Sequence, residues 1–179
     1  MLCTLKHFPG HGSSTEDSHL GFVDVTSAWS ATELEPYVNI IRAGEADAIM
    51  TAHVFNATLD PSFPATLSTP TTTGLLRDEL SYDGVVISDD MQMSAISDHY
   101  GFETAIQAAV EAGVDIITIA NNSAYEEDAA ARPVALLKRP VQDGKIGEAR
   151  IDESHRRIQR LKSKRSAAST QSSVSDHMP

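Results

Sequence analysis

Three observations in the sequence predict an α/β fold, in which helices cover a parallel sheet. Short apolar runs alternate with helical patterns along most of the 179 residues. The runs are almost uninterrupted in their apolar character, as in strands that are buried on both faces. Polar residues follow each run where the chain leaves it. This strand–helix alternation is typical of βαβ units.

Each predicted element has a recognisable beginning or end. Thr32 followed by Glu35 is the pattern of a helix capping box, and Gly44 and Gly113 stand where two helices should stop. The small, polar segment 166–179 predicts a disordered tail that follows a single domain at 1–165. The predicted strands cover residues 2–5, 47–54, 85–90 and 114–122. The predicted helical segments cover residues 31–44, 71–84, 101–113, about 124–142 and 147–164.

Polar clusters at the ends of the predicted strands point to a shared site. In a (β/α)-barrel the active site lies at the carboxyl ends of the strands, and a doubly wound sheet also binds ligands there. The pattern by itself does not separate the two folds. Four strand–helix units are half of an eight-stranded barrel, so we expect the chain to supply about its last four units. The clusters are Lys6-His7, Thr51-Ala52-His53, Ser88-Asp89-Asp90 and Asn121-Asn122.

Composition excludes some classes of function. The chain has 25 acidic and 14 basic residues, a formal charge of −11, which argues against binding to nucleic acid. No stretch reaches the 18 or so apolar residues of a membrane span. Ten of the fourteen basic residues lie between Lys138 and Arg165, where we expect a solvated helix face in preference to a basic patch. Cys3 is the single cysteine; it excludes an intrachain disulfide, and its apolar neighbours predict a buried thiol.

Two groups of residues could carry chemistry. Asp89 ends a predicted strand, where a carboxylate can act as nucleophile, base or metal ligand; Asp90 is better suited to capping the following turn. Asp17 precedes His19 by two residues, a spacing that lets a carboxylate orient an imidazole. A metal site is the rival interpretation, although no H-E-x-x-H or H-x-H spacing is present. Its candidate ligands would be His7, His11, Asp17, His19, His53 and Asp89.

Several stretches together resemble one enzyme family. They are KHFPGHGSSTEDSH, ADAIMTAHV, PATLS, LRDELSYDGVVISDDMQMSAI and AGVDIITIANN, in this order. They resemble the glycoside hydrolase family 3 β-N-acetylglucosaminidases (β-N-acetylhexosaminidases) over about residues 1–160. The resemblance implies a TIM-type (β/α)8 barrel, of which this chain supplies about strands five to eight.

The same resemblance implies a role for each site residue. Asp89 matches the nucleophile of a retaining exo-glycosidase that releases terminal β-linked N-acetylglucosamine through a covalent aspartyl-glycosyl intermediate. His19 matches the general acid/base, oriented by Asp17, on a mobile loop. Lys6 and His7 match residues that hydrogen-bond the hydroxyls of the sugar. A histidine suits such a role because its unperturbed pKa lies near neutrality.

The residues beside these have supporting roles in this interpretation. Met91 and Met93 are expected to pack near the site, and His11 to support the turn. Gly10 and Gly12 are expected to permit turns with positive φ.

Other interpretations stay open at this stage. A half barrel leaves two sheet edges and an apolar face uncovered, so association through the open edges is expected. A catalytically inactive fragment that binds sugar or serves as an association module is the main alternative, and a metal-dependent barrel hydrolase is a third. We expect no cofactor, no metal, no nucleic acid and no membrane partner. The saccharide could be a peptidoglycan fragment.

The cell compartment is open as well. Residue 1 is not followed by the layout of a signal peptide, which favours the cytoplasm. The upstream segment that would carry such a signal is expected to be missing.

Overall fold

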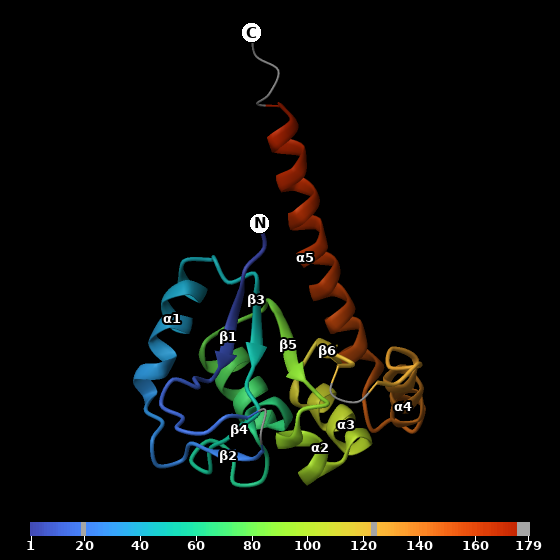
Figure 1. Ribbon diagram of the computed structural model, residues 1–179. Coiled ribbons are helices and arrows are strands. Elements are labelled where there is room, and N and C mark those ends of the chain that lie inside the picture. Colours follow the sequence, from blue (N-terminus) through green and yellow to red (C-terminus); the bar gives the residue numbers. More distant parts are fainter. Residues whose placement is uncertain (19–20, 123–124, 175–179) are drawn as a thin grey trace.

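The computed structural model describes residues 1–18, 21–122 and 125–174 and places four parallel strands in one sheet (Figure 1). The strands lie side by side in the same order as in the chain. A doubly wound sheet changes strand order at a switch point, and the described strands make no such change. The four strands are β1 (Thr4–Phe8), β3 (Ala48–Thr51), β5 (Val85–Asp90) and β6 (Ile116–Thr118).

Helices follow the strands and cover one face of this sheet. Ile49 of β3 and Val86 of β5 are fully buried there against Tyr37, Leu76 and Ile106 from the helical segments. The segments include two short 3₁₀ turns, η1 (Ala31–Leu34) and η2 (Ala65–Leu67), and a π-helix, η3 (Pro70–Glu79). The α-helices are α1 (Glu35–Arg42), α2 (Ser94–Tyr100), α3 (Phe102–Ala112), α4 (Ala131–Gln142) and α5 (Glu148–Val174).

None of the described helices covers the other face of the sheet in this way. Met50, Ile87 and Ile116 are aligned across β3, β5 and β6, are only half-buried, and belong to neither cluster of buried residues. In a closed (β/α)8 barrel this face would be the interior, filled by side chains from all eight strands. The structure therefore confirms the predicted fold class, with four β/α units of a TIM-type barrel.

A second, small sheet lies beyond the carboxyl ends of the larger one. It joins two short parallel strands, and Trp29 packs against its buried residues. Strands of two residues carry no periodic signal, and the sequence analysis did not predict them. They are β2 (Val23–Asp24) and β4 (Val54–Phe55).

The predicted helix boundaries are only partly correct. Gly44 and Gly113 end their helices with φ angles of 72° and 115°, as expected. The prediction of a capping box formed by Thr32 and Glu35 was wrong. The segment begins as a 3₁₀ turn after Ser30, and no side chain caps it. The Ser30 hydroxyl lies 2.6 Å from the Thr32 hydroxyl instead.

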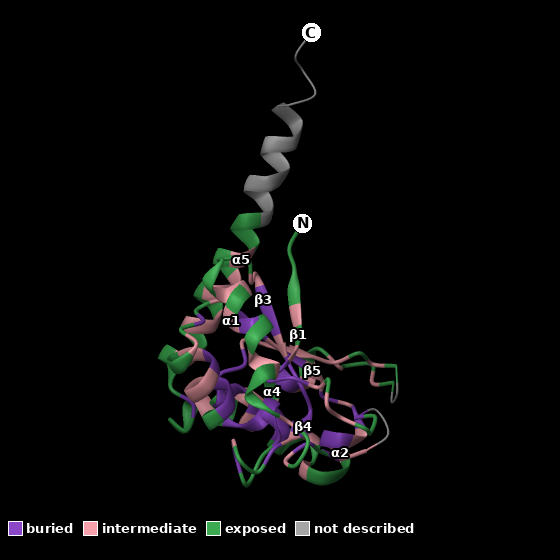
Figure 2. Cartoon of the chain, turned by 90° about the vertical axis from the view of Figure 1, so that its left-hand side faces the viewer, coloured by how far each residue is buried: buried purple, intermediate pink, exposed green. Residues whose placement is uncertain are grey.

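The amino-terminal end of the chain differs from the prediction of a buried thiol. Cys3 is exposed, because the chain enters the sheet along the edge strand β1, whose first residues are open to solvent (Figure 2). The helix α5 is described as far as Val174, and the disordered tail at 166–179 stays a prediction.

A network of charges ties α5 to the amino ends of the strands. The carboxylate of Asp115 is fully buried and contacts three guanidinium groups, at 2.7 Å from Arg77, 3.4 Å from Arg150 and 3.5 Å from Arg157. The expected solvated basic face is therefore wrong for Arg150 and Arg157, which are 18% and 11% exposed.

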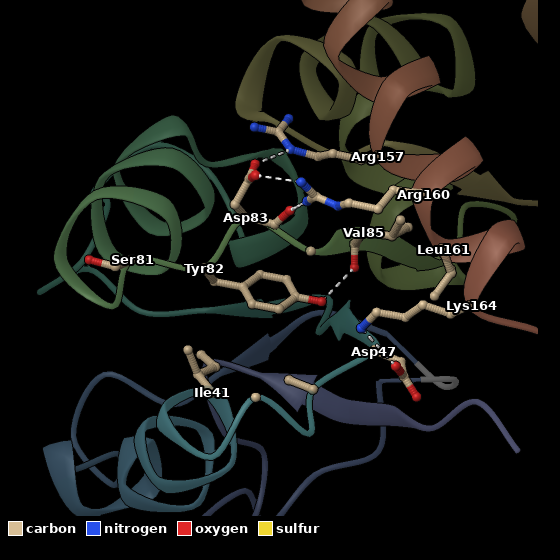
Figure 3. A pocket seen from close by; sticks show the side chains of 13 residues that line it. Ile41, Asp47, Ser81, Tyr82, Asp83, Val85, Arg157, Arg160, Leu161 and Lys164 are labelled. Carbon is tan, nitrogen blue, oxygen red and sulfur yellow. Dashed lines mark hydrogen bonds and ion pairs between the residues drawn. The ribbon is translucent and has the colours of Figure 1, made fainter. Parts of the chain in front are cut away.

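Figure 3 shows a neighbouring pocket of about 260 Å³ between α5 and the sheet. Arg157 and Arg160 both donate to Asp83 there, and Lys164 lies 3.2 Å from Asp47. The pocket borders Val85, at the opposite end of β5 from Asp89. In barrels, this end of the strands serves stability, whereas the catalytic groups lie at the other end.

Candidate active site

The polar residues at the strand ends meet, as the alternation predicted. His7 Nε2, at the end of β1, lies 3.6 Å from Asp89 Oδ2 of β5. His53, just after β3, lies 2.9 Å from the carbonyl oxygen of Asp90. The amide of Asn121, after β6, donates to the Gln92 side chain over 2.8 Å. All four strand ends are thus linked at one edge of the sheet.

The two aspartates at the end of β5 have different surroundings. Asp90 Oδ1 accepts the amides of Gln92 and Ala120 at 3.1 and 3.0 Å, which confirms the predicted structural role of Asp90. Asp89 Oδ1 accepts the amide of Asp90 at 2.8 Å, and Oδ2 is turned toward His7. The Asp89 side chain is 20% exposed, so the carboxylate is both fixed and accessible.

Lys6 and His7 are consecutive residues near the carboxyl end of β1. The peptide bond between them is cis, and the register of β1 against β3 shifts between Leu5 and Phe8. Both side chains line a pocket of about 330 Å³ together with Glu33. Lys6 is exposed and His7 is half-buried, and the imidazole of His7 lies beside the Asp89 carboxylate.

The glycine-rich loop after β1 is anchored by Glu33, which the sequence analysis did not single out. Its carboxylate accepts the Gly12 amide at 2.9 Å and the Ser13 hydroxyl at 2.5 Å. Gly10 has a φ of 121°, as predicted, whereas Gly12 has no positive φ. A Cβ on Gly10 would lie 2.5 Å from the Glu33 carboxylate, so only glycine leaves room for this contact. Nothing in the local pattern around Glu33 signals the contact.

Of the predicted pair of Asp17 and His19, only Asp17 is among the described residues. Asp17 is exposed, and Ser18 beside it is buried with its hydroxyl 3.3 Å from His11 Nε2. His11 therefore supports the turn, as expected. His19 lies outside the described residues, so its pairing with Asp17 stays a prediction.

The two methionines after the aspartates pack as predicted. Met91 is fully buried in the main core and Met93 is 5% exposed. Among residues 1–18, 21–122 and 125–174, no three His, Cys, Asp or Glu side chains are grouped to hold a metal ion. Within the same part of the chain, no helix combines the length and apolar character needed to cross a bilayer.

Comparison with known proteins decides the family. A model of the glycosyl hydrolase family 3 N terminal domain matches residues 1–161. The chain belongs to glycosyl hydrolase family 3. Among curated members, it is 34% identical over 180 residues to "Beta-hexosaminidase A" of Pseudoalteromonas piscicida. It is 40% identical over 127 residues to "Beta-hexosaminidase" of Tolumonas auensis.

Solved family 3 structures share the fold. A β-N-acetylglucosaminidase from a Paenibacillus species matches with a TM-score of 0.84 and 41% identity. That match covers 92% of this chain and 31% of the other. The β-N-acetylglucosaminidase of Thermotoga maritima matches with a TM-score of 0.73 and 30% identity, over 89% of this chain and 34% of the other.

The chain spans about a third of the length of these relatives. The match to the Pseudoalteromonas enzyme covers 92% of this chain and 30% of that protein. The match to the Tolumonas enzyme covers 69% and 38%. These shares fit a family 3 barrel of which this chain holds four β/α units.

Proposed function

We propose that this family 3 chain carries the nucleophile and the acid/base of a retaining exo-β-N-acetylglucosaminidase. The contact between His7 Nε2 and Asp89 Oδ2 is the observation that carries the proposal, because it sets a sugar-binding side chain beside an accessible carboxylate. The names of the curated and solved relatives support the choice of substrate class. The site would hold a terminal β-linked N-acetylglucosamine at the carboxyl ends of the strands.

The first step forms a glycosyl-enzyme. Asp89 Oδ1 is held by the amide of Asp90, which leaves Oδ2 to attack the anomeric carbon. The bond from that carbon to the aglycone oxygen breaks, and His19 donates a proton to the departing oxygen. Lys6 and His7 donate hydrogen bonds to the sugar hydroxyls and keep the ring in place.

The second step releases the sugar with net retention. His19, now neutral, takes a proton from a water molecule, and the water oxygen attacks the anomeric carbon. The bond to Asp89 breaks and the carboxylate is restored. Asp17 orients the imidazole in both steps.

The test uses aryl N-acetyl-β-glucosaminides with good and poor leaving groups. Asp89→Ala should lower kcat/KM by about 10⁴- to 10⁶-fold for both. With an activated substrate, added azide should restore turnover of Asp89→Ala and give the α-glycosyl azide, because azide then replaces the carboxylate on the opposite face.

His19→Ala should slow the poor leaving group far more than the good one, since only the former needs protonation. Equal losses for both leaving groups would reject His19 as the acid. A wild-type chain that binds the sugar without hydrolysing it would support the inactive sugar-binding alternative instead.

Association through the open edges of the half barrel is a second part of the proposal. β1 and β6 are the outer strands of the described sheet, and the face with Met50, Ile87 and Ile116 is only half-buried. Pairing of these edges would close a barrel of eight strands. The molar mass in solution measures this directly: a monomer at concentrations that give full activity would contradict it.

A further inference from the structure

His53 is a buried histidine that the proposed chemistry does not use. It follows β3 directly and is 1% exposed. Both ring nitrogens have partners: Nε2 lies 2.9 Å from the carbonyl oxygen of Asp90, and Nδ1 lies 2.9 Å from the Thr66 hydroxyl. A polar ring enclosed so completely costs free energy unless both nitrogens are satisfied.

The partners determine which nitrogen carries the proton. A carbonyl oxygen can only accept, so Nε2 must donate to Asp90. Burial lowers the pKa of His53, although the Asp90 carbonyl and the carboxylates of Asp89 and Asp90 act in the opposite direction. The neutral ring then has one proton, on Nε2, and Nδ1 is an acceptor that faces the Thr66 hydroxyl at 2.9 Å.

The surrounding hydroxyls complete this arrangement. The Thr66 hydroxyl lies 2.9 Å from the carbonyl oxygen of Ala52 as well as 2.9 Å from His53 Nδ1, so its single proton can go to either acceptor. The hydroxyl of Thr51 lies 2.9 Å from that of Thr66 and can donate to it. A buried row of hydrogen bonds thus runs from Thr51 through Thr66 and His53 to the backbone of Asp90.

We infer that His53 is a positioning residue for the nucleophile, holding the backbone of Asp90, a residue whose amide in turn holds the Asp89 carboxylate. This rests on the proposed function of Asp89. The Asp90 amide donates to Asp89 Oδ1 at 2.8 Å, and the Asp90 carbonyl accepts from His53 and, at 3.1 Å, from the amide of Met93. A shift of this residue would move Asp89 Oδ2 relative to the anomeric carbon, and misplacement by about 1 Å can cost about 100-fold in rate.

Two variants separate positioning from bulk packing. His53→Gln keeps an N–H that can reach the Asp90 carbonyl, whereas His53→Phe keeps the volume and removes the donor. We expect kcat of His53→Phe to fall about 100-fold with KM nearly unchanged, and that of His53→Gln to stay within about 10-fold of wild type. His155→Gln changes an exposed histidine on α5 and serves as the control. Equal kcat for the Phe and Gln variants would overturn the inference.

Two measurements do not need activity. Hydrogen exchange of the Asp90 and Ala120 amides should be at least about 10-fold faster in His53→Phe than in His53→Gln, and equal exchange would overturn the inference. Nitrogen NMR of wild type should show the His53 proton on Nε2; a proton on Nδ1 alone would also overturn it, even if His53→Phe failed to fold. A wild-type chain without hydrolysis would reject the proposed function, and the exchange data would still decide whether His53 holds Asp89.

Discussion

His7 Nε2 and Asp89 Oδ2 lie 3.6 Å apart although their strands are not neighbours. β3 separates β1 from β5 in the sheet, and strands pair at about 4.8 Å, so the two backbones are about two strand spacings apart. The side chains reach toward each other over the end of β3. The contact therefore depends on both side chains extending beyond the carboxyl ends of their strands.

Removing the imidazole of His7 tests its part in sugar binding. His7→Ala should lower kcat/KM for an aryl N-acetyl-β-glucosaminide by about 10- to 100-fold, because one or two hydrogen bonds to the sugar are lost. Most of the loss should lie in KM if the contact is equally strong before and during the reaction. His99→Ala, at an exposed position on α2, is the control. If His7→Ala had the wild-type kcat and KM, His7 would not be a sugar-binding residue.

The buried carboxylate of Asp115 should be essential for stability. Asp115→Asn leaves the guanidinium groups of Arg77, Arg150 and Arg157 without their shared anion, so the free energy of unfolding should fall by about 3–5 kcal/mol. Urea unfolding followed by circular dichroism measures the change. The exposed pair of Arg139 and Asp143 gives the matched control, and Asp143→Asn should cost less than about 1 kcal/mol. Similar losses for the two variants would contradict the network.

Gly10 should tolerate no side chain. Gly10→Ala combines a positive φ with a contact of 2.5 Å between the new Cβ and Glu33, so it should cost more than the roughly 1–3 kcal/mol of backbone strain alone. Gly144 also has a positive φ, but a Cβ added there would have no atom within 4 Å. Gly144→Ala therefore measures the backbone strain without a clash. Unfolding free energies of both variants give the difference. The new Cβ would also lie 2.6 Å from the Glu33 Cβ, so Glu33→Gly, which removes that atom too, should recover the part due to the clash when added to Gly10→Ala; no recovery would reject it.

Tyr37 should make the protein sensitive to alkali. Burial, with a smaller effect from the Glu33 charge, raises the pKa of Tyr37 from 10.0 to about 12. Above pH 10 the unfolded chain loses this proton while the folded chain keeps it. The stability from the neutral phenol is therefore complete below pH 10 and is lost as pH rises through 12, by up to about 3 kcal/mol.

Tyr37→Phe removes this titration. Its free energy of unfolding should fall less steeply between pH 10 and 12 than that of wild type. Tyr125→Phe, at a position that is 79% exposed, should leave the slope unchanged. A Tyr37→Phe variant with the wild-type slope would show that other groups control alkaline unfolding.

Local patterns were enough to predict the strands, most helices and the mouth of the site. The predicted strand 85–90 coincides with β5, and Gly44 and Gly113 end their helices, because apolar runs and glycine act over a few residues. The grouping of Asp89 with His7 was also predicted, because parallel strands bring their carboxyl ends to one edge. The role of Asp90 followed from its place before a turn.

Contacts between distant segments were decided only by the tertiary structure. Glu33 reaches the loop at Gly12 across 21 positions, and His53 reaches Asp90 across 37. Asp115 contacts guanidinium groups from residues before and after it in the sequence, so that Arg150 and Arg157, expected in solvent, are largely covered. The periodicity of apolar residues shows which face of a helix or strand is apolar. It does not show which polar side chain of another element will contact that helix or strand. Sequence alone therefore determined the order of β/α units and the candidate nucleophile, and packing decided what holds that nucleophile in place.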